Sequence, residues 1–183
     1  MENNQLILET ERLVVRSMVA DDLQSDRFLS DYVDFFIDKE SSPYAIYDVV
    51  FPTDENEIIK MAEGMQRNNH HLAICLSSDN TFIGYIFHID CGNKNLGIGY
   101  AIHSVHQNKG YGTEAVRAFI DYALKNMGFE NVNAGTANAN KPSVRMLEKL
   151  NFEKMFEQTQ SHRKDEQKNP IEFTESLYSY KLK

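Results

Sequence analysis

The chain has 183 residues, of which 42% are hydrophobic and 25% charged, and its net charge is −8. These values are typical of a globular protein and predict one domain over residues 1–183. The negative charge argues against nucleic-acid binding, which needs a cationic surface, and suits a cationic substrate such as an amine. No segment approaches the roughly 20 apolar residues that span a bilayer. Residues 1–4 lack signal-peptide features, so we expect a cytoplasmic protein without a membrane partner.

The two cysteines, Cys75 and Cys91, form no Cys-x-x-Cys pair, and the histidines complete no zinc spacing. We therefore expect two buried or half-buried thiols in strands rather than a disulfide, and no metal.

The first third of the chain predicts one strand followed by helices. Asp54 with Glu57 three residues later is a capping-box pattern, and apolar residues follow it at helical spacing. The expected elements are a strand at 13–16, short helices at 21–29 and 30–37, an irregular segment at 41–52, and a third helix from Asp54.

The middle of the chain predicts an antiparallel meander. A polar turn covers residues 77–80, and Gly92-Asn93 is a strong hairpin signal. The expected strands are 72–76, 82–89 and 96–102.

The hydrophobic period then changes to that of a helix, from Ala115 to Met127, with Gly128 suited to the position after its end. Pro142 opens another helix, because its missing N–H costs nothing there. The remaining expected elements are strands at 132–136, 152–160 and 177–182, and a polar, mobile loop at 161–169. This order predicts an α/β (α+β) fold with a mixed, mostly antiparallel sheet and helices on both faces.

The sharpest local feature joins the third meander strand to its helix and reads Gln107-Asn108-Lys109-Gly110-Tyr111-Gly112-Thr113. Two glycines one residue apart let the backbone approach a ligand. Successive N–H groups and the helix dipole make the start of a helix an anion site, and Lys109 could add a cation. The loop therefore predicts phosphate binding, although a turn that needs glycine for geometry alone is the alternative.

Gly110-x-Gly112-x-x-Ala115 also fits the dinucleotide fingerprint, so an NAD-dependent oxidoreductase is the alternative from another class. That fingerprint belongs at the first turn of a parallel unit, with an acid about 20 residues later. Here the loop follows an antiparallel meander, and the next strand ends in Thr136-Ala137-Asn138, without an acid. A P-loop is disfavoured because no Gly-Lys-Ser/Thr follows the glycines.

Four stretches together resemble the GNAT superfamily of acetyl-CoA-dependent N-acetyltransferases. Within it they are most similar to the Rim-type branch, which acetylates ribosomal-protein N-termini. The likeness covers nearly the whole chain in the right order. The stretches are residues 8–16, residues 98–102 with the loop at 107–115, residues 138–152, and, more loosely, the closing strands.

The resemblance implies direct transfer of the acetyl group from acetyl-CoA to a primary amine, without a covalent enzyme intermediate. It implies that backbone groups near Ile102 and His103 pair with the pantetheine amides, and that Ser143 protonates the departing thiolate. Asn140 and Ser143 could instead cap the helix at Pro142. The remaining implied cofactor contacts are Gln107, Asn108, Lys109, Gly110, Tyr111, Gly112, Thr113, Asn138 and Asn140.

The acceptor stays open on this resemblance. A protein N-terminal amine of the ribosomal type is the first expectation, and an aminoglycoside or a polyamine is the alternative. An acyl-CoA-binding sensor with little catalytic activity is a further one. Either a monomer or a homodimer is compatible with the sequence.

Two residues depart from the family pattern. Gly97 stands where the branch usually has an acid, two residues before Gly99, that could act as general base. Asn151 replaces the glycine usual before Phe152, which is tolerable because asparagine also visits left-handed conformations.

A hairpin turn centred on Gly92-Asn93 pairs His88 with Gly97. Opposed residues of antiparallel strands share a face about 5 Å apart, so His88 would stand where the acid is missing. Imidazole titrates near neutrality, which makes His88 a candidate base, with His103 next. The alternatives are a histidine packed beside a glycine bulge and an acceptor amine that arrives neutral.

Overall fold

The computed structural model describes residues 5–181. Within them eight strands form one sheet, in the order β1-β2-β3-β4-β5-β6-β8-β7. All neighbouring pairs are antiparallel except β5 and β6, which are parallel. The strands are β1 (Ile7–Glu9), β2 (Leu13–Ser17), β3 (His71–Leu76), β4 (Phe82–Asp90), β5 (Asn95–Ile102), β6 (Asn131–Ala137), β7 (Glu153–Gln160) and β8 (Phe173–Lys181).

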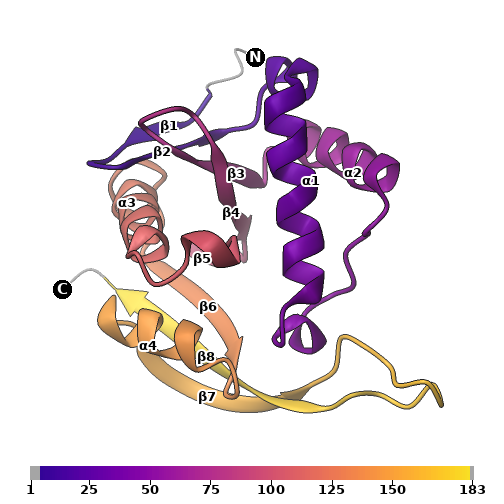
Figure 1. Ribbon diagram of the computed structural model, residues 1–183. Helices are drawn as coiled ribbons and strands as arrows, with labels where there is room; N and C mark the ends of the chain where they lie inside the picture. Colours follow the sequence, from indigo (N-terminus) through magenta and orange to yellow (C-terminus); the bar gives the residue numbers. More distant parts are fainter. Residues whose placement is uncertain (1–4, 182–183) are drawn as a thin grey trace.

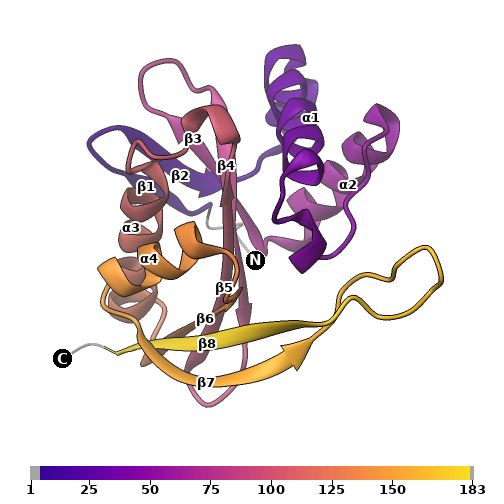
Figure 2. The ribbon, with the colours of Figure 1, turned by 60° about the horizontal axis from the view of Figure 1, so that its bottom comes forward.

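Helices cover both faces of this sheet, as the sequence predicts (Figure 1). The α-helices are α1 (Asp26–Ser41), α2 (Glu55–Asn68), α3 (Tyr111–Asn126) and α4 (Lys141–Lys149). The first core lies under α3 and α4, where Phe119 and Leu147 are fully buried. The second core lies under α1 and α2 and contains Tyr32 and Phe36. Figure 2 shows the two helix pairs on opposite sides of the sheet.

The segment before the meander differs from the prediction of two short helices at 21–29 and 30–37. It forms a short 3₁₀ turn (Ala20–Gln24) and then the single 16-residue helix α1. Ser25 caps α1 by accepting the N–H of Phe28 at 3.3 Å. Tyr32, Phe35 and Phe36 continue the buried face without a break, so nothing ends the helix at residue 30.

Other helix boundaries follow the sequence signals. Asp54 accepts the N–H of Glu57 at 3.1 Å and begins α2. Gly128, with a φ of 78°, follows the end of α3, and Asn151 takes the left-handed φ of 66° expected for it. Both positions need this conformation because the chain must leave its helix abruptly.

The strands at the two ends of the chain were predicted less well. β1 was not predicted, and β8 begins at Phe173, four residues before the expected start at Leu177. Leu182, the last residue of that predicted strand, lies outside the described residues. Cys75 is buried in β3, as expected, but Cys91 is exposed in the turn after β4.

The hairpin between β4 and β5 corrects the pairing expected for His88. Ile89, not His88, lies opposite Gly97, and His88 lies opposite Ile98. The turn is centred on Asn93, because Gly92, Asn93 and Lys94 all have positive φ and shift the register by one residue. A one-residue shift moves a side chain to the other face of the sheet.

His88 therefore faces α3, where its ring lies 5.3 Å from that of Phe119. Burial lowers the pKa of His88, and the neighbouring His70 lowers it further. The assignment of His88 as the base beside Gly97 is wrong in its geometry.

The glycine loop also sits in a different context from the one predicted. It follows the antiparallel meander, but β5, α3 and β6 form a parallel βαβ unit. The absence of an acid after β6 remains, since this strand ends at Ala137 and Asn138 follows.

Gly84 on β4 supports a prediction about stability. A Cβ there would lie 2.2 Å from the backbone oxygen of Ala101 on β5, which cannot move without disturbing the sheet. Gly64 on α2 has no atom within 4 Å of the position that a Cβ would take, and it serves as the matched control. We expect Gly84→Ala to lower the free energy of unfolding by about 1–3 kcal/mol. Gly64→Ala should raise it by about 0.5–1 kcal/mol. Urea denaturation measures both, and equal effects would contradict the close approach of β4 and β5.

Candidate functional site

A cleft of about 1010 Å³ crosses the sheet where β5 and β6 end. The two strands are paired only as far as Ile98 and Ala134, although β5 continues to Ile102 and β6 to Ala137. The last residues of each strand therefore part, and backbone groups that face one another across the gap have no partner on the opposite strand. The start of α3 and α4 line one side of this cleft, and the end of α1 with the segment after it lines the other.

The loop before α3 has the geometry of an anion site. Asn108 and Gly110 have positive φ, of 59° and 85°. Glu114 is the first residue of α3 to donate a helical hydrogen bond, to the oxygen of Gly110 at 3.0 Å. The N–H groups of residues 111–113 therefore have no helical acceptor and point out of the helix start. This arrangement fits a pyrophosphate.

Arg12, the residue just before β2, holds this loop in place. Its Nη1 donates to the oxygen of Lys109 at 2.9 Å, and its guanidinium lies 4.7 Å from the ring centre of Tyr111. Glu114 accepts from Arg12 Nε at 2.8 Å and from the hydroxyl of Thr10 at 2.7 Å. The loop is thus tied to an element about 100 residues away in sequence.

A hydroxyl pair lies where the strands part. The phenol oxygen of Tyr100 on β5 is 2.9 Å from Oγ of Ser143 on α4. Burial raises the pKa of Tyr100 to about 12, although the hydrogen bond to Ser143 opposes that shift, so the phenol keeps its proton near neutral pH. Asn140 caps α4 by accepting the backbone N–H of Ser143 at 3.3 Å. The cap leaves the Ser143 hydroxyl free for chemistry.

The structure brings most of the residues expected to bind the cofactor to this one cleft. Those that line it are Ile102, Gln107, Asn108, Gly110, Tyr111, Gly112, Thr113, Asn140 and Ser143. Gln107 also braces the end of β5, because its Nε2 donates to the oxygen of Ile102 at 2.8 Å.

Four expected residues are placed elsewhere: His88, His103, Lys109 and Asn138 do not line the cleft. His103 is buried, and its Nε2 lies 2.9 Å from the carboxylate of Asp34 on α1. The Asn138 side chain donates to Glu157 at 2.7 Å and accepts from Ser176, both on the last two strands. The side chains of His103 and Asn138 are thus occupied by structural contacts.

The sheet face under α1 also lines the cleft. It presents His71, Tyr85 and Phe87 from β3 and β4, and Glu175 from β8. Burial lowers the pKa of His71 to about 4, with smaller contributions from His70 and His88, so His71 is neutral at physiological pH. The sequence showed no local signal for these residues, because strands distant in the chain bring them together.

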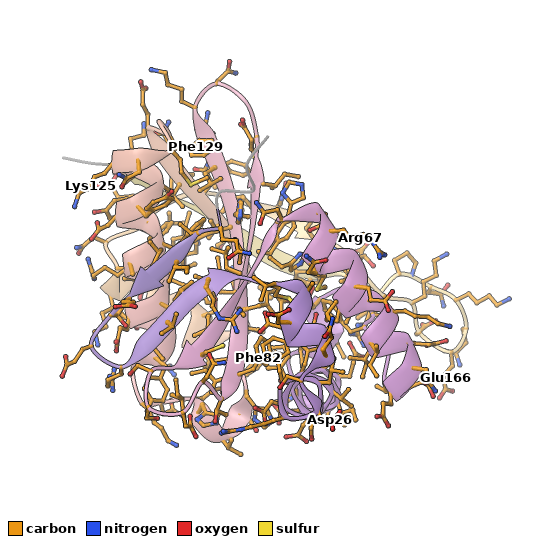
Figure 3. The ribbon with its side chains drawn as sticks, turned by 90° about the horizontal axis from the view of Figure 1, so that it is seen from above. Asp26, Arg67, Phe82, Lys125, Phe129 and Glu166 are labelled. Atoms are coloured by element: carbon orange, nitrogen blue, oxygen red, sulfur yellow. The ribbon has the colours of Figure 1, made fainter. Side chains whose placement is uncertain are left out.

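The loop between β7 and β8 is fastened to the far wall of the cleft rather than hanging free. Arg163 makes a bidentate ion pair with Glu40 at the end of α1, with distances of 2.6 and 3.0 Å. It also donates to the backbone oxygens of Asp48 and Val49, both at 2.9 Å. Figure 2 shows this loop reaching out past the ends of α1 and α2, and Figure 3 places Glu166 near its tip, across the molecule from Lys125 on α3.

Burial of Glu40 would raise its pKa, but the hydrogen bonds from Arg163 and from the N–H of Phe51 outweigh this and lower it. Only 15% of the Arg163 side chain and 11% of the Glu40 side chain are exposed. A buried pair that loses one partner leaves an uncompensated charge, so these two residues hold the cleft wall together.

Two features are absent from residues 5–181. No helix there has the length and apolar composition to cross a bilayer. Nor does this part of the chain hold a group of three or more His, Cys, Asp or Glu side chains placed to bind a metal ion.

Comparison with known proteins agrees with this geometry. The chain is 29% identical over 106 residues to an SPbeta prophage-derived uncharacterized N-acetyltransferase, YokL, of Bacillus subtilis (strain 168), an alignment that covers 57% of this chain and 60% of that protein. A GNAT-family acetyltransferase from Bacillus anthracis has a similar fold, with a TM-score of 0.76 at 20% identity over 96% of this chain and 98% of the other. The ribosomal-protein-S5-alanine acetyltransferase of Vibrio fischeri has a TM-score of 0.73 at 18% identity, over 96% of both chains.

The family model for the acetyltransferase (GNAT) domain matches residues 12–153, from the arginine that braces the glycine loop to the start of β7. The cleft, the loop and the hydroxyl pair all have their principal residues within this span. The chain belongs to the GNAT acetyltransferase family.

Proposed function

We propose that the protein transfers the acetyl group of acetyl-CoA to a primary amine, and that this amine is the N-terminal α-amine of a polypeptide. The parting of β5 from β6 carries the proposal, because it places backbone groups without a strand partner between an anion site and a half-buried hydroxyl pair. Pantetheine offers amides to such an edge, and its pyrophosphate suits the free N–H groups of the loop. We further propose that residues 1–183 act as one domain.

The residues at the starts of α3 and α4 would bind the cofactor and protonate its thiolate. The loop before α3 would hold the pyrophosphate on N–H groups of residues 111–113, and Asn140 at the start of α4 would contact the pantetheine arm. Ser143 would protonate the thiolate as the C–S bond breaks. Tyr100, which burial keeps protonated, would hand its proton to Ser143 in turn.

The rim of the cleft supports a polypeptide acceptor. Ile46, Val49 and Val50, in the segment after α1, are exposed at 42%, 48% and 68% of their surface. Exposed apolar residues beside a cleft are typical of a surface that binds a partner chain. A small amine would end inside the cleft, whereas a polypeptide continues over this rim. The fold shared with an enzyme named for a ribosomal-protein substrate is consistent with such an acceptor.

The acceptor class can be tested with a peptide panel. The probes are a peptide with a free α-amine and no lysine, its N-terminally blocked twin with one lysine, a polyamine and an aminoglycoside. We expect release of free CoA, and mass gain on the α-amine, with the first probe only. Turnover of the polyamine or the aminoglycoside instead would assign a small-molecule acceptor. If the protein binds acetyl-CoA but releases free CoA with none of the probes, it would be a sensor rather than an enzyme.

Gly112 should be essential for cofactor binding. A Cβ there would lie 3.1 Å from Sδ of Met146 and 3.4 Å from Ile102, so the larger side chain of a valine would press on these two residues, which line the cleft together with Gly112. We expect Gly112→Val to weaken acetyl-CoA binding at least about tenfold, which corresponds to about 1.4 kcal/mol. Gly64→Val on α2, far from the loop, is the control. Calorimetric titration measures both affinities, and an unchanged value for Gly112→Val would remove the pyrophosphate from this loop.

Ser143 should affect turnover more than binding. Because the cap of α4 uses only its backbone N–H, Ser143→Ala should leave the helix intact and remove only the proton donor. We expect kcat to fall by about 10²-fold, the lower end of the range for a general acid, since a thiolate is a good leaving group. Tyr100→Phe should give a smaller fall. Steady-state kinetics, with a separate measurement of acetyl-CoA affinity, checks this prediction. A wild-type kcat in Ser143→Ala would show that Ser143 is not the proton donor and serves only in the cap of α4.

A further inference from the structure

A side chain at position 97 of β5 would be crowded in this structure. A Cβ at Gly97 would lie 3.0 Å from Sγ of Cys91 and 3.2 Å from Cγ2 of Ile89. The side chains of the shifted hairpin therefore crowd this position and would have to shift to admit an acidic side chain. Proton removal from an acceptor must come from another element.

A floor of glycines lies beside this position on the same face of the sheet. Gly99 on β5 and Gly135 on β6 are the residues that directly follow the last strand pair, Ile98 and Ala134. Neither glycine has a side chain, so the point where the strands part is open toward α1. A group from a neighbouring strand can reach across it.

The side chain of Glu175 on β8 extends across the point where β5 and β6 part. Its Oε1 lies only 2.4 Å from the position that a Cβ on Gly135 would occupy, so the carboxylate lies over β6 itself. Glu175 pairs with Ala137 of β6 on one side and with Gln158 of β7 on the other. Gln158 donates from Nε2 to Oε2 of Glu175 at 2.8 Å, which holds that oxygen toward the edge and leaves Oε1 over the glycine floor.

The other acids that line the cleft are already engaged. Asp38 accepts the N–H of Ser104 at 2.9 Å and its hydroxyl at 2.5 Å. Asp48 forms an ion pair with Lys39. Among the described residues, no cationic side chain pairs with Glu175, and Oε1 accepts no hydrogen bond. Glu175 is thus the cleft-lining carboxylate with a free oxygen.

We propose that Glu175 is the catalytic base: it takes a proton from the acceptor ammonium over Gly135, in place of the acid that position 97 lacks. This rests on the proposed acetyl transfer. The ammonium loses one proton to Oε1, and the neutral nitrogen forms a C–N bond to the thioester carbonyl carbon. The C–S bond breaks, the thiolate takes a proton from Ser143, which regains one from solvent, and the nitrogen and Glu175 each release a proton to solvent. Across the reaction one proton passes to solvent.

The test is the ratio of wild-type to Glu175→Gln turnover at two pH values. With the free α-amine peptide, the amine is mostly ammonium at about pH 6.5 and mostly neutral at about pH 9.5. We expect a ratio of about 10²–10³ at the lower pH and below about 10 at the higher, because a neutral amine needs no base. Acetyl-CoA affinity should be unchanged. Glu172→Gln, an exposed acid three residues earlier, is the matched control and should match wild type.

Other titratable groups near Glu175 do not produce this pattern. His71 on β3, with a pKa of about 4, is neutral throughout, and Tyr100 on β5, with a pKa of about 12, stays protonated. Burial raises the pKa of Tyr85 on β4, so it also stays protonated. The remaining charged or titratable groups around the cleft are common to both proteins and cancel in the ratio: Asp38, Lys39, Tyr44, Tyr47, Asp48, His106, Tyr111, Arg145, Glu157, His162 and Arg163.

Gly135→Ala provides a second variant that retains the acid. Its methyl group would displace the carboxylate at the flexible end of the Glu175 side chain, so the fold should survive while turnover at about pH 6.5 falls at least tenfold. A ratio near one for Glu175→Gln at both pH values, or an equally large ratio at both, would overturn the assignment. If wild type releases no CoA with any amine of the panel, the proposed function itself fails. If only another amine of the panel is turned over, wild type and Glu175→Gln are compared at the two pH values with that amine.

Discussion

The parting of β5 and β6 is the constraint on which the site depends. Two parallel strands normally continue their ladder to the end, because an unpaired buried N–H or C=O is costly. Here pairing stops at Ile98 and Ala134, while both strands run on. Gln107 and the N–H of Asn140 satisfy the oxygens of Ile102 and Ala137, and the backbone groups that remain unpaired are left to water or to a ligand. The sheet therefore holds a binding slot within its own hydrogen-bond pattern, and the start of α3 lies at one end of that slot.

Distant ion pairs keep this opening in shape. Arg12 holds the carbonyl of Lys109 and pairs with Glu114, so the first described strands support the glycine loop. On the side of the cleft lined by the end of α1, Arg163 joins the β7–β8 loop to Glu40 and to the segment after α1. Both are multidentate arginine contacts, which fix geometry better than a lysine could. The cleft wall thus depends on charges from both ends of the chain.

Removing an acid from one strand need not remove its chemistry from the site. The shifted hairpin crowds Gly97 with Cys91 and Ile89, whereas the bare surface of Gly135 gives room to Glu175. Both positions lie on the face of the sheet that turns toward α1. Which strand supplies a carboxylate there depends on which neighbour leaves space for it. A search of one strand for the acid would therefore miss one that reaches across from another.

The sequence by itself determined the features that short spacing controls. The helix that follows the glycine loop, the capping of α2 and the left-handed Asn151 were predicted correctly, because each depends on residues a few positions apart. Asn140 caps α4, as the alternative interpretation of that residue held. The mixed sheet with helices on both faces was predicted correctly from the order of the elements. Only the tertiary structure decided the hairpin register, where three consecutive positive φ angles moved His88 to the opposite face. It also decided which distant residues meet, such as Tyr100 with Ser143 and Arg163 with Glu40. Such contacts arise from strand order and side-chain packing, and no local pattern in the chain encodes them.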